Sequence, residues 1–293
     1  LIRPTEETIA SRLPPRLVIR RGAPVELTHI MVLIDDPART VLEPLQAVKS
    51  DLRSLYDFDL MLGGGHLAGW AVDDPALVRK VDAAMNALLQ SKGEKPLLLA
   101  VGDGNHSLAT AKAYWEEIRP SLTDEERENH PARFALCEIV NIHDNALLFE
   151  PIHRMITGIS SDVLLEDWKY YAEKRGMLLS EDGSGHRFTV VSGKNEWNVC
   201  VSKPEGSIPC ETIQRYLDDL LSRYTEAEID YIHGEEALRA LASKQGNVGF
   251  ILPDIDKRTF FADVERLGKL PRKTFSMGEA DDKRFYMEAK RIS

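Results

Sequence analysis

Short apolar runs and helical spacings divide the chain into alternating strands and helices. Residues 30–34 and 97–101 are continuous apolar runs followed by turn residues, which is typical of buried strands. Apolar residues recur at helical spacing through 75–91, and a second helix is predicted over 43–56. Residues 1–28 hold four prolines, which predict an extended, irregular N-terminal arm because proline lacks a donor and restricts the preceding residue.

The most informative segment, 97–119, predicts a strand, a glycine-rich turn and a helix. The turn is Gly102-Asp-Gly-Asn-His-Ser107, and apolar residues at helical spacing follow it. Its two glycines permit a tight turn with exposed amides, and the helix directs its unpaired N–H groups and positive dipole end toward the turn. The turn is therefore a candidate seat for a small phosphate or other anion.

The rest of the chain predicts hairpins mixed with strand-helix units. One hairpin is expected from 134–142 and 146–152, and another from 187–192 and 197–202, with a last strand near 284–292. The mixture indicates an α/β fold with a mixed sheet and helices, with α+β as the alternative. We expect an anion- or nucleotide-binding core with its extended arm at 1–158 and an α/β C-terminal part packed on it at 159–293.

Composition limits the kinds of ligand and cellular location that the chain can be expected to have. The chain has 37 Lys and Arg against 47 Asp and Glu, a net charge of −10, which argues against a nucleic-acid-binding surface and favours a small ligand. Three cysteines without a Cys-x-x-Cys pair predict no disulfide framework and a cytoplasmic location. No apolar run is long enough to cross a membrane, and the first residues carry no signal-peptide pattern. The oligomeric state stays open.

Familiar motifs are absent. Neither the P-loop nor the Rossmann pattern matches, since Ser107 stands where the third glycine of the latter belongs. An EF-hand alignment beginning at Asp57 fails at the ligand positions, and the eight histidines form no zinc-binding pair. A helix-turn-helix over 211–241 would present acidic residues to DNA. Ordinary kinase and dehydrogenase classes therefore lose weight.

The candidate chemistry centres on the turn. Asp103 could hold Mg²⁺ or accept a proton from a hydroxyl, and His106 could donate to a phosphoryl oxygen or act as an acid or base. The alternative is that Asn105 and Ser107 only cap the helix. Further candidates are the anion-binding residues Gly104, Asn105, Ser107, Arg154 and Lys273, and the site-lining residues His143, His153, His233 and Ser276.

Several strings resemble a known bacterial family. They are Val101 to Lys112 around the turn, Glu150-Pro-Ile-His-Arg154, Tyr231-Ile-His-Gly234 and Leu270 to Glu279. Together they resemble a conserved bacterial family of unknown function with an Asp-Gly-[His/Asn]-His turn, over essentially the whole chain. That family is distantly similar to the ParB and sulfiredoxin-like superfamily, which includes free-serine kinases.

This resemblance implies a ParB/sulfiredoxin-like core around 97–119. Asp103, Gly104 and His106 match the family turn, whereas Asn105 replaces its first His and Ser107 replaces its Arg. We expect Arg154 or Lys273 to supply the missing cation. The serine kinases use an N-terminal glutamate as base, and family members extend further at the front, so the resemblance implies that this chain lacks an N-terminal region.

Two hypotheses remain open. In the first, the chain is a kinase-like phosphotransferase that uses ATP or ADP, with Mg²⁺ held by Asp103, to phosphorylate a small hydroxyl-bearing metabolite such as serine. In the second, it is a non-catalytic module that binds a nucleotide or metabolite as a regulatory signal or in assembly. Whether the chain is an enzyme is not decided by its sequence.

Overall fold

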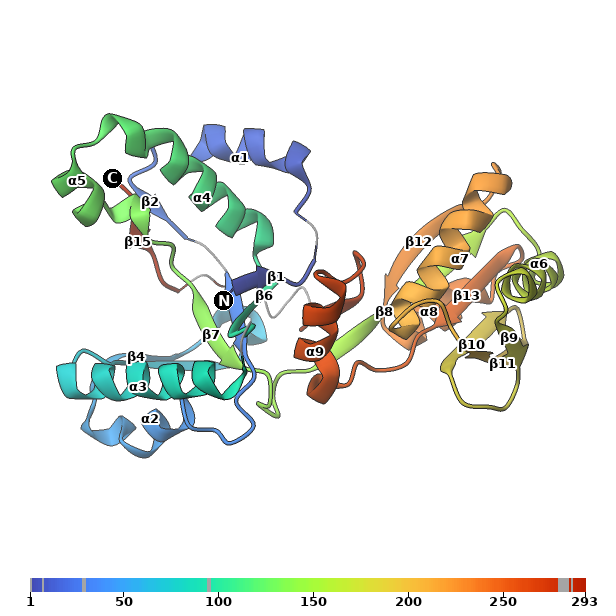
Figure 1. Cartoon of the computed structure of the whole chain (residues 1–293), viewed down its shortest axis with the longest axis horizontal. Helices are drawn as coiled ribbons and strands as arrows, with labels where there is room; N and C mark the ends of the chain where they lie inside the picture. Colours follow the sequence, from blue (N-terminus) through green and yellow to red (C-terminus); the bar gives the residue numbers. More distant parts are fainter. Residues whose placement is uncertain (1, 7, 28–29, 94–95, 279–284, 286) are drawn as a thin grey trace. The chain divides into compact units, whose positions relative to one another are not determined.

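The chain folds into two compact units. The computed structural model describes residues 2–6, 8–27, 30–93, 96–278, 285 and 287–293. One unit comprises Leu1–Leu147 and Gly278–Ser293, and the other comprises Leu148–Met277 (Figure 1). Both combine helices with sheets, and the first contains parallel as well as antiparallel pairs, so the α/β class with a mixed sheet is confirmed. The assignment of nucleotide binding to 1–158 stays a prediction.

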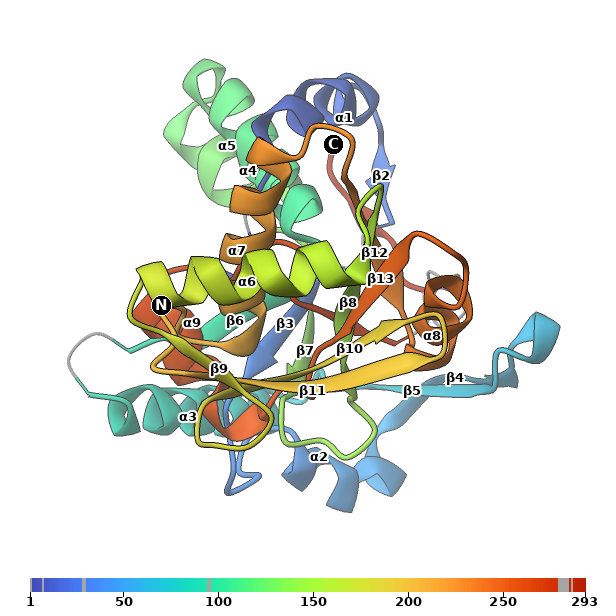
Figure 2. The same cartoon turned by 90° about the vertical axis from the view of Figure 1, so that its right-hand side faces the viewer.

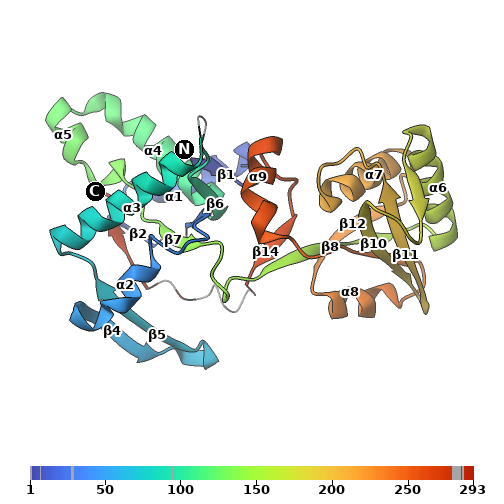
Figure 3. The ribbon, with the colours of Figure 1, turned by 60° about the horizontal axis from the view of Figure 1, so that its bottom comes forward.

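The first unit contains a four-stranded sheet with the strand order β1-β6-β3-β7. β6 runs parallel to β1 and antiparallel to β3, and β3 runs parallel to β7. Two smaller antiparallel pairs, β2 with β15 and β4 with β5, complete the unit, and the second can be followed in Figure 3. The strands are β1 Ile2–Pro4, β2 Val25–Glu26, β3 Met31–Ile34, β4 Arg53–Asp59, β5 His66–Ala71, β6 Leu99–Asp103, β7 Glu138–Asn141 and β15 Lys290–Arg291.

Two long helices cover the apolar residues of this sheet. Leu88 of α3 packs with Ile34 and Leu98, and Leu108 of α4 packs with Val32 and Val101. α1 lies beside α4 (Figure 1). The helices of the unit are α1 Leu13–Arg20, α2 Glu43–Ala47, α3 Pro75–Ser91, α4 Asn105–Ile118 and α5 Asp124–Asn129.

Two predictions for this unit are wrong. The N-terminal arm is not irregular throughout, because residues 13–20 form α1 with its prolines in the first turn, where proline is tolerated. The helix predicted over 43–56 ends at Ala47, and Arg53–Asp59 is β4 instead. Antiparallel pairing with β5 gives this segment its strand conformation, a contact invisible to local spacing.

The second unit is an antiparallel sheet with helices on both faces. Its main strand order is β12-β8-β13-β10-β11-β9, and β14 also pairs with β8. The strands are β8 Phe149–Thr157, β9 Leu178–Ser180, β10 His186–Ser192, β11 Asn195–Ser202, β12 Glu228–His233, β13 Asn247–Ile251 and β14 Phe275–Met277; the helices are α6 Ser161–Lys174, α7 Pro209–Arg223, α8 Glu235–Ala242 and α9 Lys257–Leu267.

Neighbouring residues of the central strands face opposite sides of this sheet. Ile156 and Phe250 join the core with Trp168 of α6, beneath α6 and α7, whereas Met155 and Ile251 pack with α8. Figure 2 shows α6 lying over the sheet. Because successive side chains of a strand point to opposite faces, the consecutive buried residues of β8 and β13 fit a sheet covered on both sides.

The two predicted hairpins have different outcomes. β10 and β11 form the hairpin expected around Gly193, which has a φ of 63°. The hairpin of 134–142 with 146–152 is wrong, because β7 pairs with β3 in the first unit and β8 pairs with β12 and β13 in the second. Of the strand expected near 284–292, residues 284 and 286 lie outside the described part and Lys290–Arg291 forms β15. No helix of the described residues combines the length and apolarity of a membrane span.

Candidate functional site

The turn between β6 and α4 leads into a helix whose first amides are not capped by a side chain. Gly104 is the N-cap of α4, with a φ of 83° that favours glycine, and its carbonyl accepts a hydrogen bond from the N–H of Leu108 at 2.9 Å. The helix has no side-chain cap, so the alternative in which Asn105 or Ser107 caps it is not observed. The first amides of α4 are therefore directed toward the turn, as an anion requires.

His106 is oriented by the segment that follows β1. Its Nε2 accepts a hydrogen bond from the backbone N–H of Ile9 at 3.1 Å, which leaves the proton of the neutral ring on Nδ1. Burial lowers the pKa of His106 below its ordinary value of 6.5, and the charges of Arg12 and Arg16 lower it further. At neutral pH the ring is therefore uncharged and donates through Nδ1.

Arg12 and Arg16 place positive charge beside the turn. Arg12 is the N-cap of α1 and Arg16 lies in the middle of the helix; both residues are exposed, and α1 lies along α4. Arg16 lines the same cavity as Ser107 of the first turn of α4, and the charges of both arginines lower the pKa of His106. Cations beside an uncapped helix start strengthen its attraction for a phosphate.

Two oxygen-bearing side chains of the turn fit a magnesium ion. A carboxylate oxygen of Asp103 accepts the N–H of Gly104 at 2.7 Å, and the buried Oδ1 of Asn105 has no hydrogen-bond partner in the structure. Mg²⁺ prefers oxygen ligands and is commonly held by one or two carboxylates together with water and a phosphate. The turn can thus supply part of a coordination shell, although the described residues include no cluster of three or more His, Cys, Asp or Glu able to hold a metal.

A cavity of about 280 Å³ adjoins the turn within the first unit. Ser107 and Thr110 of α4 form one part of its lining, and Arg16 and Arg20 of α1 form another. Glu26 of β2 also lines it. Since Ser107 belongs to both the turn and the cavity, a ligand in the cavity would lie next to an anion at the turn.

His143 lies elsewhere in the first unit. Its Nε2 is 2.8 Å from Oδ1 of Asp35, which also binds Lys92 at 2.7 Å. Burial raises the pKa of Asp35, but hydrogen bonds from Lys92 and His143 outweigh it and the pKa is lowered. Asp35 follows β3, whose end is at the opposite edge of the sheet from the end of β6, so the structure does not bring His143 to the turn.

Arg154 is fully buried in the second unit. Its Nε donates to Oε1 of Gln214 at 3.2 Å, Nη2 is 3.1 Å from Sγ of Cys210, and Nη1 donates to the carbonyl of Ile152. The guanidinium also lies over the ring of Tyr231, 5.1 Å from its centroid. In this arrangement Arg154 ties β8 to α7 and β12, and its role toward a phosphate stays a prediction.

The remaining predicted residues gather around β8. His153 is buried, its Nδ1 accepts the N–H of Leu252 at 3.2 Å, and burial lowers its pKa. His233 ends β12 and Ser276 lies on β14, and both strands pair with β8. Lys273 is exposed, with a φ of 60°, in the loop before β14. Their roles in a site stay predictions.

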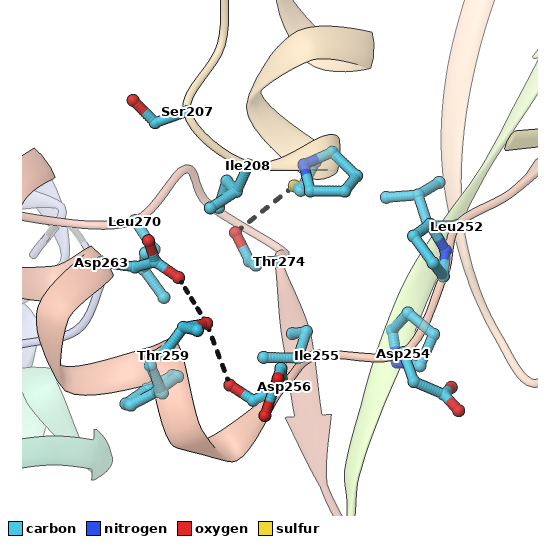
Figure 4. Close-up of a pocket in the computed structure, with 15 residues that line it drawn as sticks. Ser207, Ile208, Leu252, Asp254, Ile255, Asp256, Thr259, Asp263, Leu270 and Thr274 are labelled. Carbon is cyan, nitrogen blue, oxygen red and sulfur yellow. Dashed lines mark hydrogen bonds between the residues drawn. The ribbon is translucent and has the colours of Figure 1, made fainter. Parts of the chain in front are cut away.

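The second unit contains a larger cavity, of about 380 Å³, which is shown in Figure 4. Sγ of Cys210 is 3.4 Å from Oγ1 of Thr274 on its wall, and Oγ1 of Thr259 donates to Asp263 at 3.0 Å. Asp254 and Asp256 also line it, but none of the described lining residues is a lysine or arginine. Its acidic lining is a poor match for a phosphate, so the turn of the first unit is the better phosphate seat.

The family description "Protein of unknown function (DUF1015)" matches residues 1–220. The chain belongs to this family. Among solved structures, a mutant free serine kinase in complex with AMP has a TM-score of 0.52 and 13% identity, covering 99% of this chain and 88% of that chain. Another, in complex with ADP, has a TM-score of 0.51 with the same identity and coverage. At this identity the likeness shows a shared fold. No curated protein matches the sequence.

Sequence reasoning about this DUF1015 member missed Arg12 and Arg16. The expected sources of a cation near the turn were Arg154 and Lys273, which both belong to the second unit. The signal was the spacing of Arg12, Arg16 and Arg20, since residues four apart share one helix face. Reading 1–28 as an irregular arm concealed it.

Proposed function

We propose that this chain is a phosphotransferase that uses ATP or ADP and acts on a small hydroxyl-bearing metabolite, such as the amino acid serine. The observation that carries the proposal is the start of α4, where Gly104 is the N-cap and no side chain caps the helix. Arg16 of α1 shares a cavity with Ser107 there, and the charges of Arg16 and of Arg12, the N-cap of α1, act on His106. This arrangement supplies directed amides and positive charge in one place. The nucleotide complexes of the free serine kinases with a similar fold add support.

The residues of the turn have complementary roles in this proposal. The amides of Asn105 and His106 hold the phosphoryl oxygens, Nδ1–H of His106 donates to one of them, and Arg16 offsets their charge. Mg²⁺, held in part by Asp103, would neutralise charge on the nucleotide when bound. The hydroxyl oxygen bonds to the terminal phosphorus, the bond to the bridging oxygen breaks, and ADP or AMP leaves.

Two carboxylates are candidates for the base that receives the hydroxyl proton. Asp103 is the first, because it ends β6 at the turn. Glu6 is the second, because it lies between Thr5, which hydrogen-bonds Val101 through its N–H and hydroxyl, and Ile9, which donates to His106. Substitution of each by the neutral amide separates them, because loss of turnover with retained nucleotide affinity marks the base.

The first test is a thermal-shift screen with ATP, ADP, CTP and pyrophosphate, each with and without Mg²⁺. A ligand at about 100 times its Kd stabilises the folded state by roughly 2.7 kcal/mol, an easily measured shift. We expect a Mg²⁺-dependent shift that His106→Ala abolishes and His66→Ala, an exposed histidine of β5, retains. No shift with any nucleotide would contradict the proposal.

The second test is transfer of phosphate to serine, threonine and other hydroxyl compounds, followed by phosphorus NMR. Product formation that Asp103→Asn or Glu6→Gln abolishes establishes the enzyme. Nucleotide binding that depends on His106 without transfer to any acceptor would leave the regulatory or structural binding module as the function. The cytoplasmic location stays a prediction of the sequence.

A further inference from the structure

An ion pair is buried at the end of α1. Nη1 of Arg20, the last residue of the helix, donates to Oε2 of Glu26 on β2. The residues are only 8% and 6% exposed, and the guanidinium lies 5.5 Å from the ring centroid of Tyr114 on α4. A pair this deeply buried is expected to have its remaining polar atoms satisfied as well.

Three polar side-chain atoms of this ion pair make no hydrogen bond to the described residues. Nε and Nη2 of Arg20 and Oε1 of Glu26 are buried and make no hydrogen bond in the structure. Arg21, one residue on, uses the same two nitrogens to hold both carboxylate oxygens of Glu117, at 2.8 and 2.7 Å. The corresponding edge of Arg20 therefore has the geometry for a second carboxylate, which none of the described residues supplies.

The unpartnered atoms are themselves covered from solvent, but both residues that carry them line the 280 Å³ cavity beside the turn, so a ligand there would reach these atoms after a shift of the two side chains. Its other walls are apolar at Ile19, Val25 and Ile292, and hydroxyl-bearing at Ser107 and Thr110. The volume lies just below the roughly 300–1,000 Å³ typical of pockets for drug-sized ligands, so the occupant is a small metabolite. It must bring an acceptor pair for Arg20 and a donor for Glu26.

We infer that this cavity binds the zwitterionic head of a free α-amino acid, with the carboxylate on the Nε and Nη2 edge of Arg20 and the ammonium on Oε1 of Glu26. The inference rests on the proposed function in one respect, because it assigns the cavity to the acceptor of the phosphoryl group. An α-amino acid carries both charges on one carbon, so it meets both unpartnered groups together.

The charge of Glu26 excludes the simplest alternative, an inorganic phosphate on Arg20. A phosphate would bring its negative charge close to the carboxylate of Glu26, whose unpartnered Oε1 can only accept a hydrogen bond while ionised. A simple carboxylic acid would satisfy Arg20 but leave Oε1 buried without a donor. A simple amine would leave the arginine edge unfilled.

The direct test compares ligands by calorimetry on the full chain. L-Serine should bind at least 10-fold more tightly than glycolate, which lacks the ammonium, than ethanolamine, which lacks the carboxylate, and than inorganic phosphate. Glu26→Gln should weaken serine binding at least 10-fold and reduce the preference over glycolate, whereas Glu117→Gln, in the exposed pair with Arg21, should not. Equal affinity for serine and glycolate in the unaltered chain would overturn the inference.

A second readout avoids variants that fail to fold. Cys137 is half-buried; burial raises the pKa of its thiol, and the charge of Glu26 raises it further. An ammonium bound to Glu26 should partly cancel that charge, so the alkylation of Cys137 at fixed pH, followed by peptide mass, should accelerate with serine and not with glycolate. Unchanged alkylation at a serine concentration that saturates binding would place serine elsewhere and overturn the inference.

The outcomes also separate this inference from the proposed function. Serine binding that depends on Glu26, without nucleotide binding at His106, would uphold the cavity assignment and remove the phosphotransferase. Phosphotransfer to serine with a KM unchanged in a folded Glu26→Gln chain would retain the function and overturn the cavity assignment. Arg20→Lys is a third variant to test, because lysine keeps the positive charge but cannot bind a carboxylate through two nitrogens. It should raise the KM for serine and leave the nucleotide affinity unchanged.

Discussion

Gly104 offers the sharpest test of the turn, because its conformation is required both by the fold and by the proposed phosphate seat. Its φ of 83° and ψ of 18° lie in the left-handed region, which costs a non-glycine residue about 1–2 kcal/mol. We expect Gly104→Ala to lower the free energy of unfolding by about this amount. That loss is expected where alanine stays in this region. Where alanine leaves it, the folded chain escapes the strain, the nucleotide must restore it, and affinity instead falls by about 5–30-fold.

The matched control is Gly246→Ala. Gly246 also has a φ of 83°, a Cβ added there would meet nothing within 4 Å, and it lies after α8 in the second unit. Urea unfolding reports the strain that each free folded variant retains, and calorimetry with ATP and Mg²⁺ should show weakened binding only in Gly104→Ala. If Gly104→Ala loses less than about 0.5 kcal/mol of stability and still binds nucleotide as tightly as Gly246→Ala does, the phosphate does not bind at this turn.

Three further predictions test the turn and the fold of the first unit. The pKa of His106 is lowered in the folded state, so the neutral ring contributes its full stabilisation above pH 6.5, and this stabilisation is lost as the pH falls through the lowered pKa. His106→Gln should remove this pH-dependent loss of stability from urea midpoints measured across the same pH range. Arg16→Met should raise the pKa of His106 toward its ordinary value, read by NMR titration, and weaken nucleotide binding with a smaller salt dependence. Asp36→Ala should lower the free energy of unfolding by at least about 2 kcal/mol in urea, since its buried carboxylate accepts the N–H groups of Thr40 at 2.6 Å and Val41 at 2.8 Å; a loss below about 0.5 kcal/mol would contradict that assignment.

The sequence pattern predicted an element correctly where the residues of that element alone determine its conformation. The apolar runs of β3 and β6, the helix of α3 from Pro75 to Ser91 and the hairpin of β10 with β11 agree with their predictions. The strand, turn and helix around Gly104 agree as well, because glycine at a strand end and apolar residues at helical spacing are both local features.

Pairing between distant segments could not be read from the sequence. β7 resembles one arm of a hairpin with β8, yet it pairs in parallel with β3, about a hundred residues earlier. The cations of the candidate site were missed for a similar reason. Two prolines made α1 read as irregular, although prolines in a first helical turn only replace amides that have no partner there.

The single face of α1 links the two halves of the proposed site. Arg16, whose charge lowers the pKa of His106, lines the cavity, and so does Arg20, which carries the unpartnered nitrogens one helical turn further on. Four residues advance a helix by about 6 Å, which sets the scale between a phosphoryl group near Arg16 and a carboxylate on Arg20. If the cavity holds the amino acid as proposed, serine and threonine should be better acceptors than homologues with longer side chains, because a longer side chain would move the hydroxyl away from a phosphoryl group bound at the turn. The rigid helix would thus act as the ruler that selects serine and threonine over longer homologues, because both groups are held on one element.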